Sequence, residues 1–119
     1  MQIPILKQGQ YLIVSIQAIV SDRDLLNLEE ELSVKIGKYR SIGVIIDITT
    51  LDVMDSFSTR TLRNIALTIK LRGAETVIVG IQPEVAFAMI QLGLRLDDVK
   101  TALNLEEGIL LLNAPSKEH

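Results

Sequence analysis

The polar pair Asp55 and Ser56 lies where an apolar segment of the chain gives way to an amphipathic one. Residues 43–48 before the pair are typical of a buried strand, and the pattern after it indicates a helix that begins near Phe57. A helix N-terminus presents unpaired backbone N–H groups and the positive end of the helix dipole. Ser56 is therefore a candidate helix cap and a candidate switch, because a phosphate added there would be stabilised. Serine is so common at helix caps that position alone favours the structural role.

Three aspartates around the same turn, Asp47, Asp52 and Asp55, could hold Mg²⁺ through oxygen ligands, as in a phospho-receiver domain. No histidine, cysteine or basic cluster accompanies them, and aspartate is also common in turns for its local hydrogen bonds. The only histidine is the terminal His119, and the chain has no cysteine and no glycine-rich phosphate loop. We therefore expect no catalytic residues, no cofactor and no metal site, with the magnesium-dependent receiver as an alternative.

Composition favours a single globular domain that does not bind nucleic acid. The 119 residues are 48% apolar, 23% charged and only 3% aromatic, so the core must consist of Leu, Ile, Val and Ala. The 12 basic and 15 acidic side chains are scattered along the chain, which disfavours a nucleic-acid partner. No segment resembles a signal peptide or a membrane span, so we expect a cytoplasmic protein without a membrane partner. The mean hydropathy of +0.34 indicates apolar surface that a partner covers.

The hydrophobic pattern predicts strands that alternate with helices. Expected strands are 3–8, 11–16, 43–48, 76–81 and 100–103, and expected helices are 22–39, 57–72, 84–92 and 105–112. The first two strands form a hairpin, and Pro4 places the first strand at an edge because proline cannot donate a hydrogen bond to a sheet. Short connections between the later elements imply a mainly parallel sheet. Ser56 and Gln82 should then lie beyond the carboxyl ends of its strands.

Individual residues set the ends and the buried faces of these elements. Ser21 and Asp24 resemble a capping box ahead of the first helix. In the third expected helix, Val85, Met89 and Leu92 should face the core. The fourth expected strand should be buried, because its residues are almost all apolar.

Four segments of the chain together resemble the STAS domain of anti-sigma-factor antagonists. They read Val-Ile-Ile-Asp-Ile-Thr at 44–49, Asp-Val-Met-Asp-Ser-Phe at 52–57, Gly-Ile-Gln-Pro-Glu-Val at 80–85 and Leu-Gly-Leu at 92–94. The similarity runs over nearly the whole chain. The Gly-Ile-Gln-Pro segment and the absence of an N-terminal sensory domain indicate the RsbS-type branch, which belongs to the bacterial stressosome.

The resemblance implies a fold as well as a family. The expected fold is α/β, a single STAS domain over residues 1–114, with a mainly parallel mixed sheet, an antiparallel N-terminal edge strand and helices chiefly on one face. Residues 115–119 are expected to form a frayed C-terminal tail.

The resemblance also implies a non-catalytic scaffold that binds an RsbT-type serine kinase, sequesters it within a stressosome and releases it when phosphorylated. The family's phosphorylated serine directly follows the aspartate of the turn, which matches Ser56, and Asp55 and Phe57 are the implied turn and partner-binding residues. Ser58 and Thr59 are second candidates for phosphorylation because they lie close by. Further implied partners are RsbR-type STAS paralogues, a second copy in a homodimer, a large hetero-oligomer and an RsbX-type phosphatase.

Two other kinds of STAS protein are alternatives to the stressosome branch. The turn here reads Asp-Ser-Phe-Ser, whereas sporulation antagonists have Asp-Ser-Ser-Gly, and this departure favours the stressosome branch. The alternative is a SpoIIAA-like antagonist that acts directly on an anti-sigma kinase. A STAS module from an anion transporter is disfavoured because the sequence has no membrane span.

Overall fold

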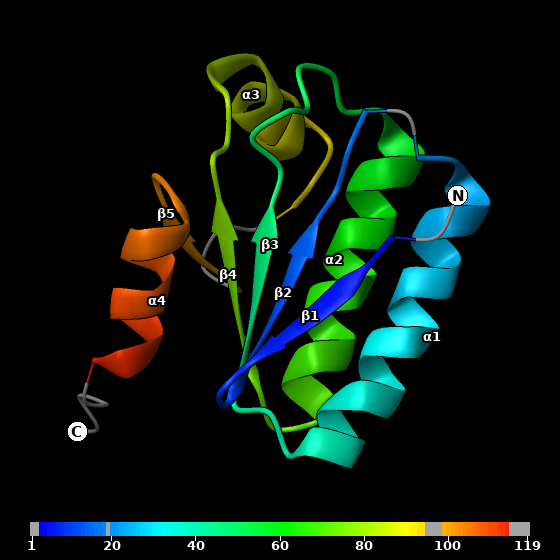
Figure 1. Cartoon of the computed structure of the whole chain (residues 1–119). Coiled ribbons are helices and arrows are strands. Elements are labelled where there is room, and N and C mark those ends of the chain that lie inside the picture. Colours follow the sequence, from blue (N-terminus) through cyan, green and yellow to red (C-terminus); the bar gives the residue numbers. More distant parts are fainter. Residues whose placement is uncertain (1–2, 19, 95–98, 115–119) are drawn as a thin grey trace.

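Strands and helices alternate along the chain in the computed structural model, which describes residues 3–18, 20–94 and 99–114 (Figure 1). The strands are β1 (Ile5–Gln8), β2 (Tyr11–Ser15), β3 (Gly43–Asp47), β4 (Glu75–Val79) and β5 (Lys100–Ala102). The helices are α1 (Asp22–Tyr39), α2 (Ser56–Leu71), α3 (Pro83–Gln91) and α4 (Leu105–Asn113). The expected tail, 115–119, lies outside the described residues.

The strands form one sheet in the order β1-β2-β3-β4-β5. β1 pairs antiparallel with β2, and every later pair is parallel, so the mixed sheet with an antiparallel N-terminal edge is confirmed. The register aligns Ile13, Ile45 and Val77 on one face and Val14, Ile46 and Ile78 on the other, which gives each face of the sheet a continuous apolar row. β4 lies between β3 and β5 and is buried after its first residue, Glu75, as its apolar run predicts.

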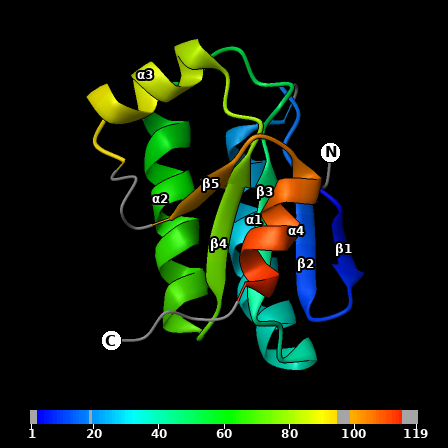
Figure 2. The same ribbon diagram turned by 90° about the vertical axis from the view of Figure 1, so that its left-hand side faces the viewer.

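The two faces of the sheet carry different layers of helix (Figure 2). Alternate residues such as Leu12, Val44 and Ile78 belong to a core cluster with the inner faces of α1 and α2. The residues between them contact α4 instead, and this smaller cluster contains Ile13, Ile45, Val77, Val79, Leu105, Ile109 and Leu112. The third helix, α3, lies beyond the carboxyl ends of the strands (Figure 1). Because α1 and α2 share one face, the helices gather chiefly on that side, as expected.

Local chemistry explains how the helices begin and pack. Ser21 and Asp24 form the predicted capping box, in which each side chain accepts a hydrogen bond from the other residue's backbone N–H. Gly108 is buried against the sheet, and a Cβ there would lie 2.9 Å from Val79 Cγ1, so the glycine lets α4 approach closely. Tyr11 donates a hydrogen bond from its hydroxyl to the Asn113 side chain and ties the end of α4 to β2.

One predicted core residue lies at the surface. Val85 and Met89 of α3 are fully buried as expected, but Leu92 is 38% exposed. The prediction for Leu92 is wrong because α3 ends at Gln91, so Leu92 is the C-cap and no longer follows the helical stripe. Within the described residues, no helix is both long enough and apolar enough to cross a membrane.

Candidate functional site

The loop between β3 and α2 is shaped by the last residue of the strand. Asp47 Oδ1 accepts hydrogen bonds from the Thr49 backbone N–H at 2.9 Å and from the Thr49 hydroxyl at 2.5 Å. The Ile48 N–H donates to the Val79 carbonyl at 3.1 Å, which continues the pairing with β4 for one more residue. Asp47 therefore stabilises a turn, and this structural role explains an aspartate at this position without invoking a bound ligand.

Asp55, and not Ser56, is the N-cap of α2. Its backbone is extended, with φ −90° and ψ 176°, and its Oδ1 accepts a hydrogen bond from the Ser58 backbone N–H at 2.7 Å. The prediction that Ser56 caps the helix is wrong by one residue, because aspartate is as good a cap as serine and its charge also suits the dipole. The N–H of Ser58 holds the pKa of the Asp55 carboxyl below its ordinary value of 3.8.

Ser56 occupies the first position of α2 and is exposed. Within the described part of the chain, no hydrogen bond involves its hydroxyl, because the carboxylate of Asp55 already caps the helix. The first-turn N–H groups and the dipole favour a phosphate at this place, whereas the neighbouring carboxylate opposes it. The hydroxyl is therefore free to react without loss of the cap.

Ser58 and Thr59, the second candidates for phosphorylation, are less accessible than Ser56. Thr59 is 1% exposed, and its hydroxyl is buried without a hydrogen-bond partner, so a kinase could reach it only after α2 opened. Ser58 is half-buried and faces a cavity between α1 and α2. Phe57 is also half-buried, and its carbonyl accepts a hydrogen bond from the Thr61 hydroxyl at 2.9 Å. The structure brings these residues into one helical turn but exposes only Ser56 fully.

Gln82 links α3 to the loop that leads to Ser56. It is the N-cap of α3, yet its side chain makes no cap hydrogen bond. Its Nε2 donates instead to the Thr49 carbonyl at 2.7 Å. Gly80 allows this approach, because its φ is +75° and a Cβ there would overlap the Thr49 side chain. Sequence reasoning placed Gln82 near the strand ends but did not find this bond, since nothing in the local sequence indicates its partner.

Exposed apolar side chains surround this end of the molecule. Val53 in the loop is 74% exposed, and Phe87 and Ile90 on the outer face of α3 are 67% and 60% exposed. In Figure 1 the loop and α3 lie beside each other beyond the strand ends. The signal for this surface was present in the sequence, because Phe87 and Ile90 lie three residues apart and off the stripe of Val85 and Met89.

The aspartates do not converge on a metal site. Among the residues described, no group of three or more histidine, cysteine, aspartate or glutamate side chains could hold a metal ion. Asp47 is engaged with Thr49 and Asp55 with Ser58, which leaves only Asp52 of the predicted trio without a turn or cap role. The magnesium-dependent receiver therefore has no supporting geometry in this part of the chain.

Comparisons with known proteins agree on one family. A family model of the STAS domain matches residues 2–108. A serine-to-glutamate variant of RsbS from Moorella thermoacetica is 38% identical, with a TM-score of 0.85 over 94% of this chain and 95% of that chain. A chain from a structure of the stressosome, described as a signal integration and transduction hub, is 39% identical, with a TM-score of 0.83 over 92% of this chain and 95% of that chain.

A curated relative is longer than the segment that matches. The RsbT co-antagonist protein RsbRA of Bacillus subtilis (strain 168) is 36% identical over 72 residues, which is 60% of this chain. The match covers only 26% of RsbRA, so this chain spans a small part of that relative's length.

Proposed function

Because the chain belongs to the STAS-domain family, with an RsbS-like fold and sequence, we propose that it is a non-catalytic stressosome scaffold switched by phosphorylation of Ser56. In this role it binds an RsbT-type serine kinase and releases the kinase once the serine is modified. Longer relatives such as RsbRA suggest which kind of partner this chain binds, and the proposal transfers nothing else from them.

The observation that carries the proposal is the division of roles between Asp55 and Ser56. Asp55 caps α2, while the adjacent Ser56 is exposed and its hydroxyl forms no hydrogen bond to any described residue. A phosphate would add a charge of about −1.5 to −2 beside the helix N-terminus. The dipole favours that charge and Asp55 opposes it, so the domain should remain folded after phosphorylation.

Release of the kinase follows from the surroundings of Ser56. Val53, three residues before Ser56, and Phe87 and Ile90 on α3 offer the apolar surface on which a partner would dock, at the same end of the molecule as the neutral hydroxyl. A phosphate dianion in that interface would have to lose its hydration, which is costly unless the partner supplies matching positive charge. Phosphorylation should therefore weaken the complex without disturbing the fold.

Further partners follow from the family. We infer co-assembly with RsbR-type STAS paralogues, homodimers within a large cytoplasmic assembly, and a phosphatase of the RsbX type that resets Ser56. We infer no intrinsic catalysis. ATP hydrolysis by the purified chain that disappears in an Asp47→Asn or Asp55→Asn variant would contradict this inference.

The decisive experiment is phosphorylation by an RsbT-type kinase with ATP, followed by mass mapping of the modified residue. Label is expected on Ser56 alone, and Ser56→Ala should abolish it while kinase binding is preserved. Ser58→Ala is the matched control, because Ser58 lies two residues further along α2 and is half-buried, and this variant should be labelled like the wild type. Undiminished phosphorylation of Ser56→Ala would overturn the assignment.

Ser56→Asp tests the release step separately. The aspartate should leave the cap at Asp55 intact and weaken the kinase complex, although it carries less charge than a phosphate. An unchanged kinase affinity for both Ser56→Asp and the phosphorylated wild type would show that modification does not control release.

A further inference from the structure

A cavity of about 270 Å³ lies beside the Ser56 turn, between the N-terminal ends of α1 and α2. Its floor consists of buried apolar side chains from both helices, from the residues that directly follow β2 and β3, and from the β3–α2 loop, namely Ile16, Leu25, Ile48, Leu51, Met54 and Leu62. In open α/β sheets, ligands bind outside the carboxyl ends of the strands, which is where this cavity lies. Its volume is below the range typical of drug-sized ligands, so it suits a smaller molecule.

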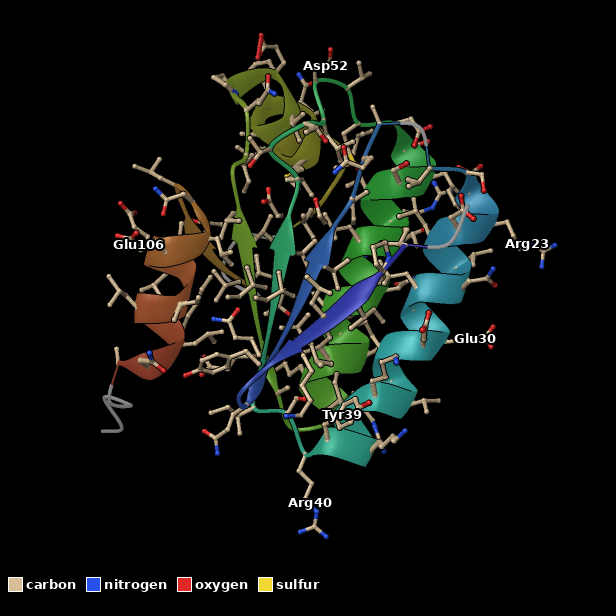
Figure 3. All side chains as sticks on the ribbon, viewed as in Figure 1. Arg23, Glu30, Tyr39, Arg40, Asp52 and Glu106 are labelled. Atoms are coloured by element: carbon tan, nitrogen blue, oxygen red, sulfur yellow. The ribbon has the colours of Figure 1, made fainter. Side chains whose placement is uncertain are left out.

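The rim of the cavity is acidic. Asp22 at the start of α1, Asp52 in the loop and Asp55 at the cap of α2 line it, and no lysine, arginine or histidine does so among the described residues. Arg23, the next residue on α1, points outward and away from the body of the molecule, whereas Asp52 lies on the loop beyond the strand ends (Figure 3). Over the described ranges, the side chains of Asp22 and Asp52 make no hydrogen bond or ion pair.

This combination of floor and rim restricts the ligand. The three rim carboxylates outweigh the partial positive charges of the α1 and α2 N-termini, about half an elementary charge each, and no basic side chain lines the cavity. The rim therefore disfavours phosphates, nucleotides and other free anions. A bare metal ion is disfavoured because the described carboxylates do not form a group that could hold one. The complementary molecule has an apolar body for the floor and one positive charge for the rim.

We propose that the cavity binds a small amphiphilic cation, with an ammonium or guanidinium group at the Asp22–Asp52–Asp55 rim and an apolar body on the floor. The cation would touch the same loop that presents Ser56. A phosphate on Ser56 would add negative charge beside the rim and strengthen binding of the cation. By thermodynamic reciprocity, the bound cation would favour the phosphorylated protein by the same factor. Only this coupling rests on the proposed function, and the cavity itself does not.

The test is a titration of the full chain with phenethylammonium, followed by backbone amide NMR. Shifts should be confined to the residues that line the cavity, with a dissociation constant of about 1 mM, as expected for so few ligand atoms. The uncharged analogue 2-phenylethanol separates the two parts of the ligand, since it keeps the apolar body and lacks the charge. Weaker binding of the alcohol supports the proposal, and equal binding or shifts elsewhere overturn it.

Two variants test whether the positive charge of the ligand binds at the rim. Asp52→Asn should weaken phenethylammonium binding about two- to five-fold, as for one partly exposed ion pair. Glu84→Gln removes an exposed carboxylate from the first turn of α3, outside the cavity lining, and should leave the affinity unchanged. Equal losses in both variants would contradict a local site. Asp52 is exposed, and an unchanged spectrum outside the cavity will verify that its variant is folded.

The coupling between the state of Ser56 and cation binding is tested by a separate measurement. Ser56→Asp should bind phenethylammonium more tightly than the wild type, whereas Ser56→Ala should not. Equal affinities would overturn the coupling. Failure of the proposed function would appear instead in the kinase assay, as label on a residue other than Ser56.

Discussion

The carboxylate of Asp55 and the hydroxyl of Ser56 have separate roles at the start of α2. Asp55 satisfies the Ser58 N–H, while Ser56 lies exposed one position further on. A switch at this place requires that modification leave the helix intact, and a cap that does not depend on the modified residue meets that requirement. The same separation means that substitutions at the two positions should have different effects on stability.

Asp55→Ala should lower the free energy of unfolding by about 1 kcal/mol, because it removes the N-cap of α2. Ser56→Ala should change the free energy of unfolding by only a few tenths of about 1 kcal/mol, since the serine is exposed and is not the cap. Urea denaturation measures both, and Asp55→Asn is the control that retains a capping side chain. A larger loss for Ser56→Ala than for Asp55→Ala would contradict the assignment of the cap.

The lowered pKa of Asp55 predicts how stability depends on pH. The Ser58 N–H favours the ionised carboxylate in the folded state, so the unfolded chain binds a proton more readily. The stabilisation is fully present above the ordinary pKa of 3.8 and is lost as pH falls through the lower folded value. Denaturation of wild type and Asp55→Asn at a series of acidic pH values should show a shallower loss in the variant. Parallel curves would rule out a contribution from Asp55.

At the scale of elements, the β3–α2 loop and α3 behave as one unit at the carboxyl end of the sheet. Gln82 reaches from the N-terminus of α3 to the Thr49 carbonyl, and Gly80 leaves room for the Thr49 side chain. The loop that precedes Ser56 is therefore held from one side by the start of α3. The apolar residues Phe87 and Ile90 are fixed relative to that loop in consequence.

Gly80→Ala should destabilise the domain more than Gly9→Ala. Both glycines have positive φ, +75° and +60°, so alanine at either position costs about 1 kcal/mol or more in backbone strain. Only at Gly80 would the new methyl group also overlap a neighbour, the Thr49 side chain, whereas nothing lies within 4 Å at Gly9. Chemical denaturation of the two variants isolates this steric term. Equal losses would mean that Thr49 moves aside freely.

Elements with strong local signals could be predicted from the sequence, and their spatial partners could not. The capping box at Ser21 and the buried stripe of α1 depend on residues three or four positions apart, so the sequence contains the whole interaction. The cap of α2 was misplaced by one residue because Asp55 and Ser56 are both good caps. The bond from Gln82 to Thr49 joins residues 33 positions apart, and the burial of Thr59 depends on the packing of the whole domain. Neither has a local signature.

At the scale of the molecule, the apolar surface indicated by the positive mean hydropathy can be located. Leu103, directly after β5, is 79% exposed, and Leu110 and Leu111 on α4 are 64% and 36% exposed. β5 is the last strand in the sheet order. A shallow cavity between β5 and α4 is lined by Thr101, Ala102, Glu107, Leu110 and Leu111. Within the described strands β5 has one neighbour, so its outer edge also offers unpaired backbone groups. These features suit the self-association or co-assembly expected from composition.

Leu110→Glu should therefore weaken self-association or co-assembly with an RsbR-type partner, while the domain stays folded because the side chain is already 64% exposed. A leucine that becomes fully buried in an interface contributes roughly 2 kcal/mol, and a buried unpaired glutamate would oppose association further. Light scattering across a range of concentrations measures the effect. Val34→Glu is the matched control, since Val34 is 67% exposed on α1, which covers the opposite face of the sheet from α4. A wild-type chain that stays monomeric both alone and with the partner would refute association altogether, and equal loss in the two variants would place the interface away from α4.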